Sequence, residues 1–233
     1  MTYTVIARCA RSGQLGIGIA TGSLAAGGYC PAIRGGLGAV STQAFVNLKL
    51  GTLALRLLEQ GFAPAKVMAE LDEDDPQFTF RQVGIVDGTG GAAVHTGENT
   101  RPWSGHVLGE GYLTMGNVLA SIGVVEAMAA TFEGNGDEDL DERLLRVLEA
   151  GRDAGGQQAA DGRHLPERSA AVIVHGHRDY GDIDLRVDAH ETAVDELRRV
   201  HGVYKPYEPY YQLRHDDPRN TPAQDVWARE NVP

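Results

Sequence analysis

The chain has 233 residues, of which 42% are hydrophobic and 23% charged, an ordinary composition for a water-soluble fold. Thirty-two acidic residues against 21 basic ones give a formal net charge of −11 at pH 7. Phosphate backbones and anionic lipid headgroups repel a surface of this sign, so neither nucleic acid nor a membrane is an expected partner.

Alternating side chains predict two strands at the start of the chain, over residues 2–9 and 15–22. The short glycine-containing turn at residues 11–14 joins them as a hairpin. A short strand over 28–34 leads into a third strand-like run over 37–46. The sequence therefore predicts that the chain opens with antiparallel strands.

After residue 50 the apolar residues recur at helical spacing, and strands and helices then alternate in blocks. This order favours a layered α/β arrangement over a βαβ alternation, and no GxGxxG motif leads into a helix. The first elements predicted here are two helices, which end at Gly61 and before Pro76, and two strands over 79–87 and 91–96. One strand or extended segment follows between Trp103 and Val118, and then two helices lined by Ile122–Phe132 and Leu140–Leu148. The last elements are strands over 168–175 and 181–188 and a helix over 192–200.

The remaining sequence is rich in tyrosine and proline, so we divide the chain into one domain over 1–203 and a C-terminal tail over 204–233. The prolines argue against regular structure in the tail. Tyrosines offer a large contact area with a polar tip, and a proline-rich segment loses little backbone freedom when it binds. We expect the tail to lie as an extended arm across a second subunit of a homodimer or higher homo-oligomer. The alternatives are that it wraps its own domain or is disordered.

Two observations bear on location. The two cysteines, Cys9 and Cys30, are not in a CxxC spacing, which fits a reducing compartment. The first residues lack a basic region followed by an apolar run, and no apolar stretch approaches about 18 residues, so we expect neither a signal peptide nor a membrane span. A cytoplasmic protein is the expectation.

Thr2 is the candidate nucleophile. Threonine is small enough for an aminopeptidase to remove Met1, which would give Thr2 a free α-amino group. That amine has an ordinary pKa of about 8, so it can accept the proton of the Thr2 hydroxyl. The alternative is that Thr2 is only a β-branched residue that opens a strand.

Several short strings resemble a prokaryotic family, domain of unknown function 1028, which is grouped with the N-terminal-nucleophile (Ntn) hydrolases and their proteasome β-subunits. The resemblance covers residues 1 to about 200, and the strings are MTYTVIAR, GAVSTQAFVN, RQVGIVD, HTG, WSGH, MGN, SAAVIV and DLRVDAH. It implies a four-layer αββα sandwich, an α/β (α+β) fold of two stacked, mainly antiparallel sheets.

The resemblance to proteasome subunits also implies further site residues. Arg34 corresponds in place to a lysine that lowers the pKa of the catalytic amine, although a guanidinium cannot shuttle protons. The alternatives are that Arg34 binds a substrate carboxylate through two hydrogen bonds or is only a surface arginine at a strand edge. Asp153 lies in a similar Arg-Asp segment and is expected to orient the amine of Thr2. The proteasome pattern has an aspartate on the second strand, but residues 18–23 contain no acid. Thr21 or Ser23 is a candidate to supply a hydroxyl there.

A polar cluster interrupts the apolar strand over 37–46 and the residues that follow it. Buried polar groups need partners, so the cluster either joins neighbouring strands or faces a pocket. By fold analogy it lies beside the nucleophile, and Gln43 and Asn47 are the candidates to donate hydrogen bonds to an oxyanion. Ser41 and Thr42 are expected to be ordinary strand residues.

The histidines carry weaker hypotheses. His175 and His177 share one face at a strand end and could chelate a metal, but no further ligand completes a motif, so we expect neither a metal nor another cofactor. His95, His106 and His190 lie in the strings shared with the family and are candidate pocket residues.

Three functions are therefore open. The leading hypothesis is an amidohydrolase that acts through Thr2 on a small or peptide-like metabolite. The second is a non-catalytic binding or scaffold protein that retains the fold, because the second-strand acid is missing. Metal-dependent hydrolysis through His175 and His177 is the third.

Overall fold

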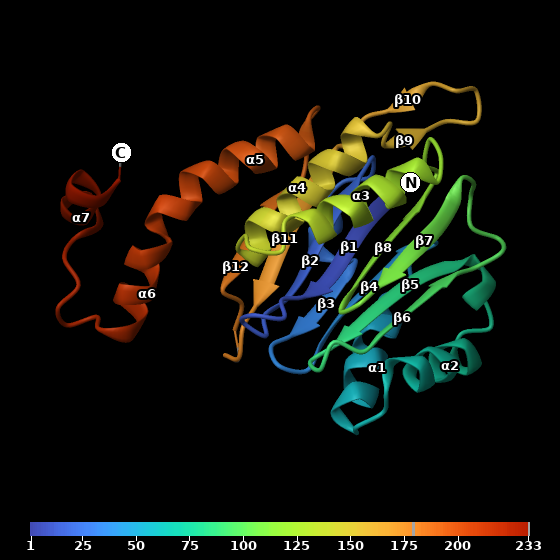
Figure 1. Cartoon of the computed structure of the whole chain (residues 1–233), viewed down its shortest axis with the longest axis horizontal. Helices are drawn as coiled ribbons and strands as arrows, with labels where there is room; N and C mark the ends of the chain where they lie inside the picture. The colour runs from blue at the N-terminus through green and yellow to red at the C-terminus, as the bar shows by residue number, and fades with distance from the viewer. Residues whose placement is uncertain (179, 233) are drawn as a thin grey trace.

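Two antiparallel sheets pack face to face between two layers of helices in the computed structural model, which describes residues 1–178 and 180–232 (Figure 1). One sheet contains, from edge to edge, β12 (Ile183–Val187), β11 (Ser169–His175), β2 (Leu15–Thr21), β1 (Thr2–Arg8), β8 (Tyr112–Asn117) and β7 (Ser104–Gly109). The other contains β3 (Pro31–Arg34), β4 (Gly38–Ala44), β5 (Arg81–Asp87) and β6 (Ala92–Thr96). The expected αββα sandwich is confirmed.

The first strand, β1, lies inside the six-stranded sheet, paired with β2 on one side and β8 on the other. Its side chains alternate between two apolar environments. Tyr3, Val5 and Ala7 join the cluster under the helices, whereas Ile6 joins the cluster between the sheets. Because both faces of the strand are covered, the sequence of β1 is apolar on both faces up to its polar first residues.

The layer between the sheets is made of aliphatic side chains from both of them. Its buried members are Ile6, Leu15, Ile17, Ala39, Val86, Leu113 and Met115. The sheets lie close together at Gly84, where an added Cβ would lie 2.8 Å from the Leu113 side chain. A larger residue at this position of β5 would therefore force the Leu113 and Ile6 side chains to shift.

The outer layers are helix pairs, as predicted. Helices α1 (Leu48–Glu59) and α2 (Pro64–Asp74) cover the four-stranded sheet, and α3 (Gly123–Gly134) and α4 (Leu140–Asp153) cover the six-stranded sheet (Figure 1). Helix α5 (Ala193–Tyr204) packs on β11 and β12 beside α4. A small pair, β9 (Gln157–Gln158) and β10 (His164–Leu165), follows α4.

The sequence prediction is wrong in two places. The segment between Trp103 and Val118 is a hairpin, β7 and β8, because Gly111 adopts a φ of 72° and allows a tight turn there. The tail is helical, with a 3-10 turn at Lys205–Tyr207 followed by α6 (Glu208–Asp216) and α7 (Gln224–Asn231). Its prolines stand in the first turns, where a missing N–H breaks no helical hydrogen bond.

No helix in the described residues is long and apolar enough to cross a membrane.

A buried carboxylate joins the two helices α1 and α2 to the start of β5, an inner strand of the four-stranded sheet. Asp75, at the end of α2, accepts hydrogen bonds from Arg81 Nε at 2.9 Å, Asn47 Nδ2 at 2.9 Å and the Gln77 backbone N–H at 3.0 Å. Asn47 also caps α1 by accepting from the Lys49 N–H at 3.2 Å. Burial alone would raise the pKa of Asp75, but these three donors outweigh it and lower the pKa to about 2.

We predict that Asp75→Asn lowers the free energy of unfolding by about 2 kcal/mol at pH 7, because the charged acceptor of three hydrogen bonds is lost. The folded pKa lies below the unfolded value of about 3.9. The carboxylate therefore stabilises the fold above about pH 4, and this contribution is lost as the pH falls towards about 2.

Urea denaturation at pH 7 and near pH 3 measures both effects, and the gap between wild type and Asp75→Asn should narrow at the lower pH. The neighbouring exposed carboxylate in Asp74→Asn is the control and should leave stability unchanged. Equal losses in the two variants would contradict this role of Asp75.

Candidate functional site

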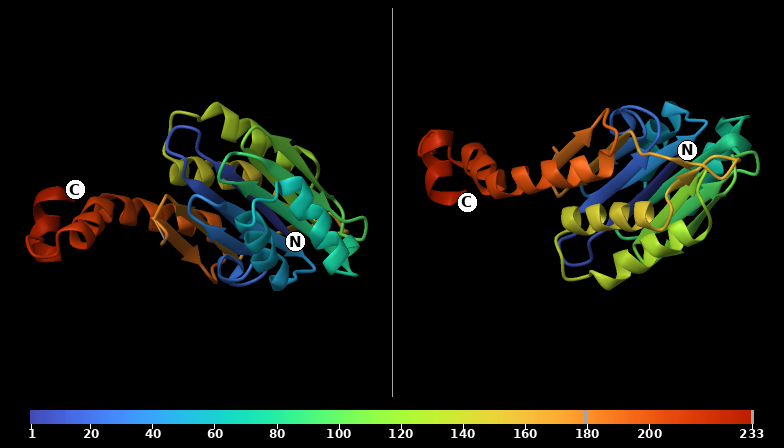
Figure 2. Two further views of the ribbon diagram at one scale, coloured as in Figure 1. Left: turned by 90° about the horizontal axis from the view of Figure 1, so that it is seen from below. Right: turned by 90° about the horizontal axis from the view of Figure 1, so that it is seen from above.

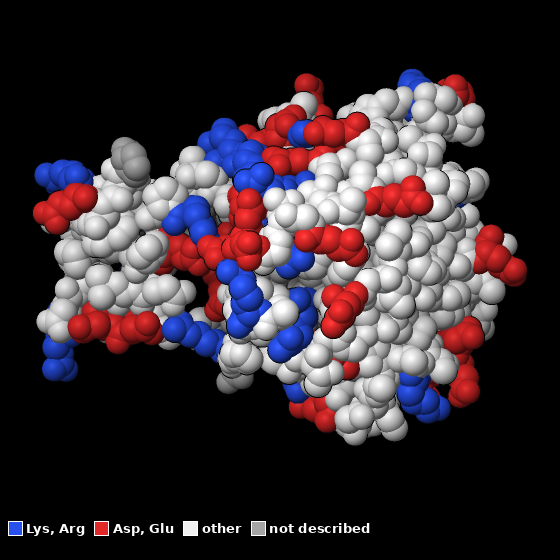
Figure 3. Space-filling view, in the orientation of Figure 1, with Lys and Arg blue, Asp and Glu red and all other residues white. Residues whose placement is uncertain are grey.

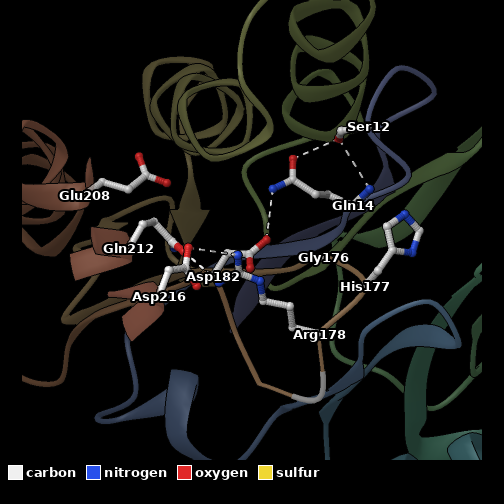
Figure 4. A pocket seen from close by; sticks show the side chains of 9 residues that line it. All are labelled: Ser12, Gln14, Gly176, His177, Arg178, Asp182, Glu208, Gln212 and Asp216. Atoms are coloured by element: carbon white, nitrogen blue, oxygen red, sulfur yellow. Dashed lines mark hydrogen bonds and ion pairs between the residues drawn. The ribbon is translucent and has the colours of Figure 1, made fainter. Parts of the chain in front are cut away.

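A cavity of about 590 Å³ lies far from the N-terminus and is lined by the β1–β2 turn, the loop after β11 and helix α6 (Figure 4). Its polar side chains bind one another. Gln14 donates to Asp182 at 3.1 Å, and Arg178 donates to Gln212 at 2.7 Å. His177 also lines this cavity. Among the described residues, no group of three or more His, Cys, Asp or Glu is placed to hold a metal.

The opposite end of the sandwich holds the candidate nucleophile. Thr2 lies across from Thr21 of β2 and Asn117 of β8, so neighbouring strands fix its backbone on both sides. By strand alternation its side chain shares a face with Thr4 and Ile6, the face that meets the second sheet. Along β1, the side chains that face the second sheet thus change from aliphatic at Ile6 to hydroxyl-bearing at Thr4 and Thr2.

Two threonine hydroxyls converge on one carbonyl oxygen. Thr2 Oγ1 donates to the Met1 carbonyl oxygen at 2.6 Å, and Thr21 Oγ1 donates to the same oxygen. The two hydroxyl oxygens lie 3.2 Å apart, and the Ser23 N–H donates to Thr21 Oγ1 at 3.1 Å. The structure therefore brings the predicted pair Thr2 and Thr21 together, around a position where an acyl oxygen can bind.

A cavity of about 100 Å³ opens beside this pair. It is lined by Met1, Ala44, Phe45, Arg101 and Asn117. The Arg101 guanidinium lies 5.5 Å from the centre of the Phe45 ring, so the cation stacks at the cavity mouth. The cavity therefore combines an apolar wall, an amide and one guanidinium.

The α-amine of Met1, at this cavity, has a lowered pKa. Burial is the larger cause and the charge of Arg101 the second, and together they lower the pKa of the Met1 α-amine to about 6. The thiol of Cys30 lies near the amine, and burial raises its pKa to about 12, so it stays protonated at pH 7. The Met1 α-amine is therefore mostly neutral at pH 7.

A buried network of amides closes the inner wall. Thr4 Oγ1 donates to Gln43 Oε1 at 2.6 Å, and Gln43 Nε2 donates to Gln82 Oε1 at 2.8 Å. Asn117 Nδ2 donates to the same Gln82 oxygen at 3.0 Å, so the chain of hydrogen bonds leads back to the cavity. Gln43 is thus a supporting residue of the wall and is not among the residues that line the cavity.

Asn47 does not face the nucleophile either, because its side chain caps α1 and binds Asp75. Of the rest of that cluster, Ser41 Oγ and Thr42 Oγ1 are buried without a hydrogen-bond partner in the part of the chain that the structure describes.

The expectation that Arg34 lies beside Thr2 is wrong. Strand β3 pairs with β4 so that Pro31 lies opposite Ser41 and Arg34 opposite Gly38, which carries Arg34 away from the site. Its neighbour Gly35 packs on the loop after β11, at the end of the six-stranded sheet about 20 Å from Thr2. Arg34 forms an ion pair with Glu59 at 2.6 Å there.

Asp153 is also placed differently from the expectation. Its carboxylate accepts from Arg152 Nε at 2.8 Å and is 66% exposed at the end of α4. Within the described residues, 1–178 and 180–232, no hydrogen bond or ion pair joins the Asp153 carboxylate to Thr2. The fold therefore gives Asp153 no direct path to orient the amine.

The remaining candidate histidines make structural contacts. His95 stacks on Phe78, and His106 shares a hydrogen bond of 2.9 Å with Thr96. His190 Nδ1 accepts from the Thr192 N–H at 3.1 Å, near the start of α5.

Sequence reasoning missed three residues that shape the site: Arg101, Asn117 and Gln82. Asn117 and Gln82 left a signal, because each is a lone amide in a strand of mostly apolar residues. Arg101 left none, since it lies in a loop whose path depends on the packing of the hairpin β7–β8.

Comparisons with known proteins place the chain by family and by fold. The model of a family of unknown function (DUF1028) matches residues 2–197. A crystal structure of a protein from Silicibacter pomeroyi, described with the same family, is similar with a TM-score of 0.79 and 26% identity, covering 88% of this chain and 86% of that one. No curated protein matches the chain.

More distant structures are Anbu, an ancestral β-subunit, from Yersinia bercovieri and HslV from Trypanosoma brucei. Anbu has a TM-score of 0.42 and 11% identity over 86% of this chain and 93% of its own. HslV has a TM-score of 0.42 and 11% identity over 75% of this chain and 99% of its own.

We predict that the α-amine of protein that retains Met1 titrates near pH 6, and that Arg101→Gln raises this pKa because one of its two causes is removed. The rate of amine acylation against pH, followed by mass spectrometry of the N-terminal peptide, measures it. Arg178→Gln changes a guanidinium at the opposite end and should leave the titration unaltered. An unchanged pKa in Arg101→Gln would show that this guanidinium does not act on the amine.

Proposed function

Since the chain belongs to the DUF1028 family, whose function is unknown, we propose that it is an Ntn amidohydrolase in which Thr2, freed by removal of Met1, cleaves an amide bond of a small or peptide-like metabolite. The observation that carries the proposal is the position of Thr2 Oγ1, 2.6 Å from the Met1 carbonyl oxygen and beside a cavity that Met1 lines. Nucleophile, base and acyl position meet at one strand end.

The chemistry follows from these three groups. The neutral amine of Thr2 accepts the Oγ1 proton, directly or through a water, and Oγ1 attacks the amide carbonyl carbon. The C–N bond breaks as the departing amine takes the proton, which leaves an ester on Thr2. Water, deprotonated by the same amine, then releases the acid and restores the hydroxyl.

Thr21 supports the acyl oxygen in this proposal. Its hydroxyl already donates to the carbonyl oxygen of Met1 and is itself held by the Ser23 N–H at 3.1 Å. A donor fixed in advance stabilises the negative charge that develops on the oxygen during attack. Removing Met1 adds its volume to the cavity of about 100 Å³, and this enlarged space receives the acyl group.

Arg101 favours an acyl group that carries a negative charge. Its guanidinium lies at the cavity mouth over Phe45, and carboxylates bind guanidinium in a paired geometry. The proposed substrate class is therefore a small amide with a carboxylate a few bonds from the scissile carbonyl.

One observation favours the alternative of a non-catalytic binding protein. Met1 fits its surroundings closely, because its sulfur lies 2.5 Å from where a Cβ on Gly22 would stand and its carbonyl oxygen accepts two hydroxyl bonds. Protein that keeps Met1 has its amine one residue away from the Thr2 hydroxyl, and the site is filled.

The test is labelling by an electrophilic β-lactone, which acylates an activated threonine hydroxyl. We predict that protein without Met1 gains one lactone mass, mapped to Thr2 by peptide sequencing. Thr2→Ser should keep the label, since it retains a hydroxyl and the amine, whereas Thr2→Ala should lose it by at least about 100-fold in rate.

The matched control is Thr21→Val, which removes the second hydroxyl while Thr2 stays in place. It should slow labelling by about tenfold to 100-fold without abolishing it, because a donor to the acyl oxygen is lost. Equal labelling of Thr2→Ala and wild type would place the nucleophile elsewhere and refute the proposal.

A further inference from the structure

Met1 occupies the candidate site in the way that a bound acyl group would. Its carbonyl oxygen accepts hydrogen bonds from the hydroxyls of Thr2 and Thr21. Its side chain lies against Gly22, where an added Cβ would stand 2.5 Å from the Met1 sulfur and 3.4 Å from Met1 Cγ. The residue therefore shows which protein atoms surround the carbon chain of an acyl group at this position.

Hydrogen bonds hold the backbone around Gly22 in place. The Gly22 N–H donates to Oε1 of the fully buried Gln157 at 3.0 Å. The carbonyl oxygen of Thr21 accepts from the Arg168 N–H at 2.7 Å. The carbonyl oxygen of Pro166 would lie 3.3 Å from the added Cβ, so the backbone is packed closely behind Gly22. A side chain added at Gly22 would therefore displace the flexible chain of the acyl group and not the protein wall.

The two groups bonded to the Cα of Met1 lie in different surroundings. The side chain packs on Gly22, which offers only backbone and no charge. The α-amine lies in the field of Arg101, whose charge lowers the pKa of this amine. An anionic group at the position of the amine would be attracted to the guanidinium. The site thus distinguishes an apolar direction, towards Gly22, from an anion-binding direction, towards Arg101.

The site is open to solvent on one side. Met1 is 38% exposed, and the N-terminus lies at the end of the sandwich away from the C-terminal helices in all three ribbon views (Figures 1 and 2). On the face drawn in Figure 3, charged side chains gather over α4 and α5, whereas the surface over β7 is mostly uncharged. An apolar chain longer than the methionine side chain can therefore continue from the site into solvent.

We propose that Gly22 is a specificity-determining residue, the wall of a subsite for an unbranched apolar chain on the carbon next to the scissile carbonyl. We call this space the Gly22 subsite. The proposal rests on the proposed function, because the subsite becomes free only when Met1 is removed. It narrows the substrate class to amides whose acyl group carries such a chain, of at least the length of the methionine side chain, together with the carboxylate that faces Arg101. Glycine is needed at this position because any Cβ would fill the space that the third atom of the chain occupies.

The binding of two simple amides tests the length of the subsite. The ethyl branch of butanamide ends at the position of Met1 Cγ, whereas the butyl branch of hexanamide extends past the position of the Met1 sulfur. The full chain is made to begin at residue 2 and carries Thr2→Ala to prevent turnover, and NMR titration gives the two dissociation constants. Hexanamide should bind at least about tenfold more tightly than butanamide, because the subsite buries its longer branch. Equal affinities would overturn the proposal without any substitution at Gly22.

Adding Gly22→Ala to this protein should weaken the binding of hexanamide at least about tenfold and change that of butanamide by less than about twofold. The reason is that the new Cβ collides with the sulfur position but stands at ordinary contact distance from the Cγ position. The unchanged affinity for butanamide also shows that the variant is folded. An unchanged affinity for hexanamide, or an equal loss for both amides, would overturn the proposal.

The matched control is Gly202→Ala in α5. It adds the same methyl group at an exposed position where, apart from its own helix backbone, no described atom lies within 4 Å of the added Cβ. Both dissociation constants should stay the same in this variant. A loss of hexanamide binding in Gly202→Ala as large as that in Gly22→Ala would mean that the methyl group does not act through the subsite, and the proposal would fall.

Lactone labelling of protein that begins with Thr2 separates this proposal from the proposed function. β-Propiolactone delivers an acyl group without the branch, and its α-butyl derivative delivers one with it. Gly22→Ala should slow labelling by the α-butyl lactone at least about tenfold more than labelling by β-propiolactone. Equal slowing would overturn the subsite while Thr2 remains the nucleophile. Absence of all labelling would refute the proposed function, and the amide titrations would still decide on the subsite.

Discussion

The face-to-face packing of two antiparallel sheets is the constraint on which the rest of the molecule depends. Aliphatic side chains such as Ile6, Leu113 and Val86 fill the space between the sheets, and Gly84 allows them to approach. Because β1 is hydrogen-bonded to a strand on each side, its first residue has little freedom to move. The chain terminus, which is usually the most mobile part of a protein, is here among the most constrained. A terminal nucleophile benefits from this placement, because its hydroxyl is held close to a reacting geometry.

The change from apolar to polar packing at the end of the sheets creates the site. Polar groups buried there must find partners, and Gln82 supplies most of them. Its side-chain oxygen accepts from Gln43 and Asn117, and its nitrogen donates to Thr96 and to backbone carbonyls of β7 and β8. This network fixes the wall behind Thr2 and Thr4. The same hydrogen bonds that stabilise the end of the sandwich therefore orient the residues of the candidate site.

The sequence predicted the layers because they depend on local periodicity. Period-two runs became strands, helical spacing became the two outer pairs, and the order of blocks predicted a layered α/β arrangement. The four-layer sandwich itself was implied by the resemblance to the family. The resemblance to proteasome subunits also implied Thr21 or Ser23 as a hydroxyl near Thr2, and the hairpin register places Thr21 opposite Thr2. The position of Arg34 did not follow, since it depends on how the second sheet is oriented over the first. The cation at the site is instead Arg101, from a loop with no periodic pattern. The helices of the tail were missed because proline was read as a breaker without regard to its place in the first turn.

The central claim is that Thr2 acts with its own free amine, which requires that Met1 be absent from the mature chain. Intact-mass measurement of the protein produced in its own host tests this most directly. We expect a mass lower than that of the full sequence by one methionine, with Thr2 as the first residue in N-terminal sequencing. A population that retains Met1 throughout would contradict it and leave the site filled by Met1, as the binding-protein alternative requires.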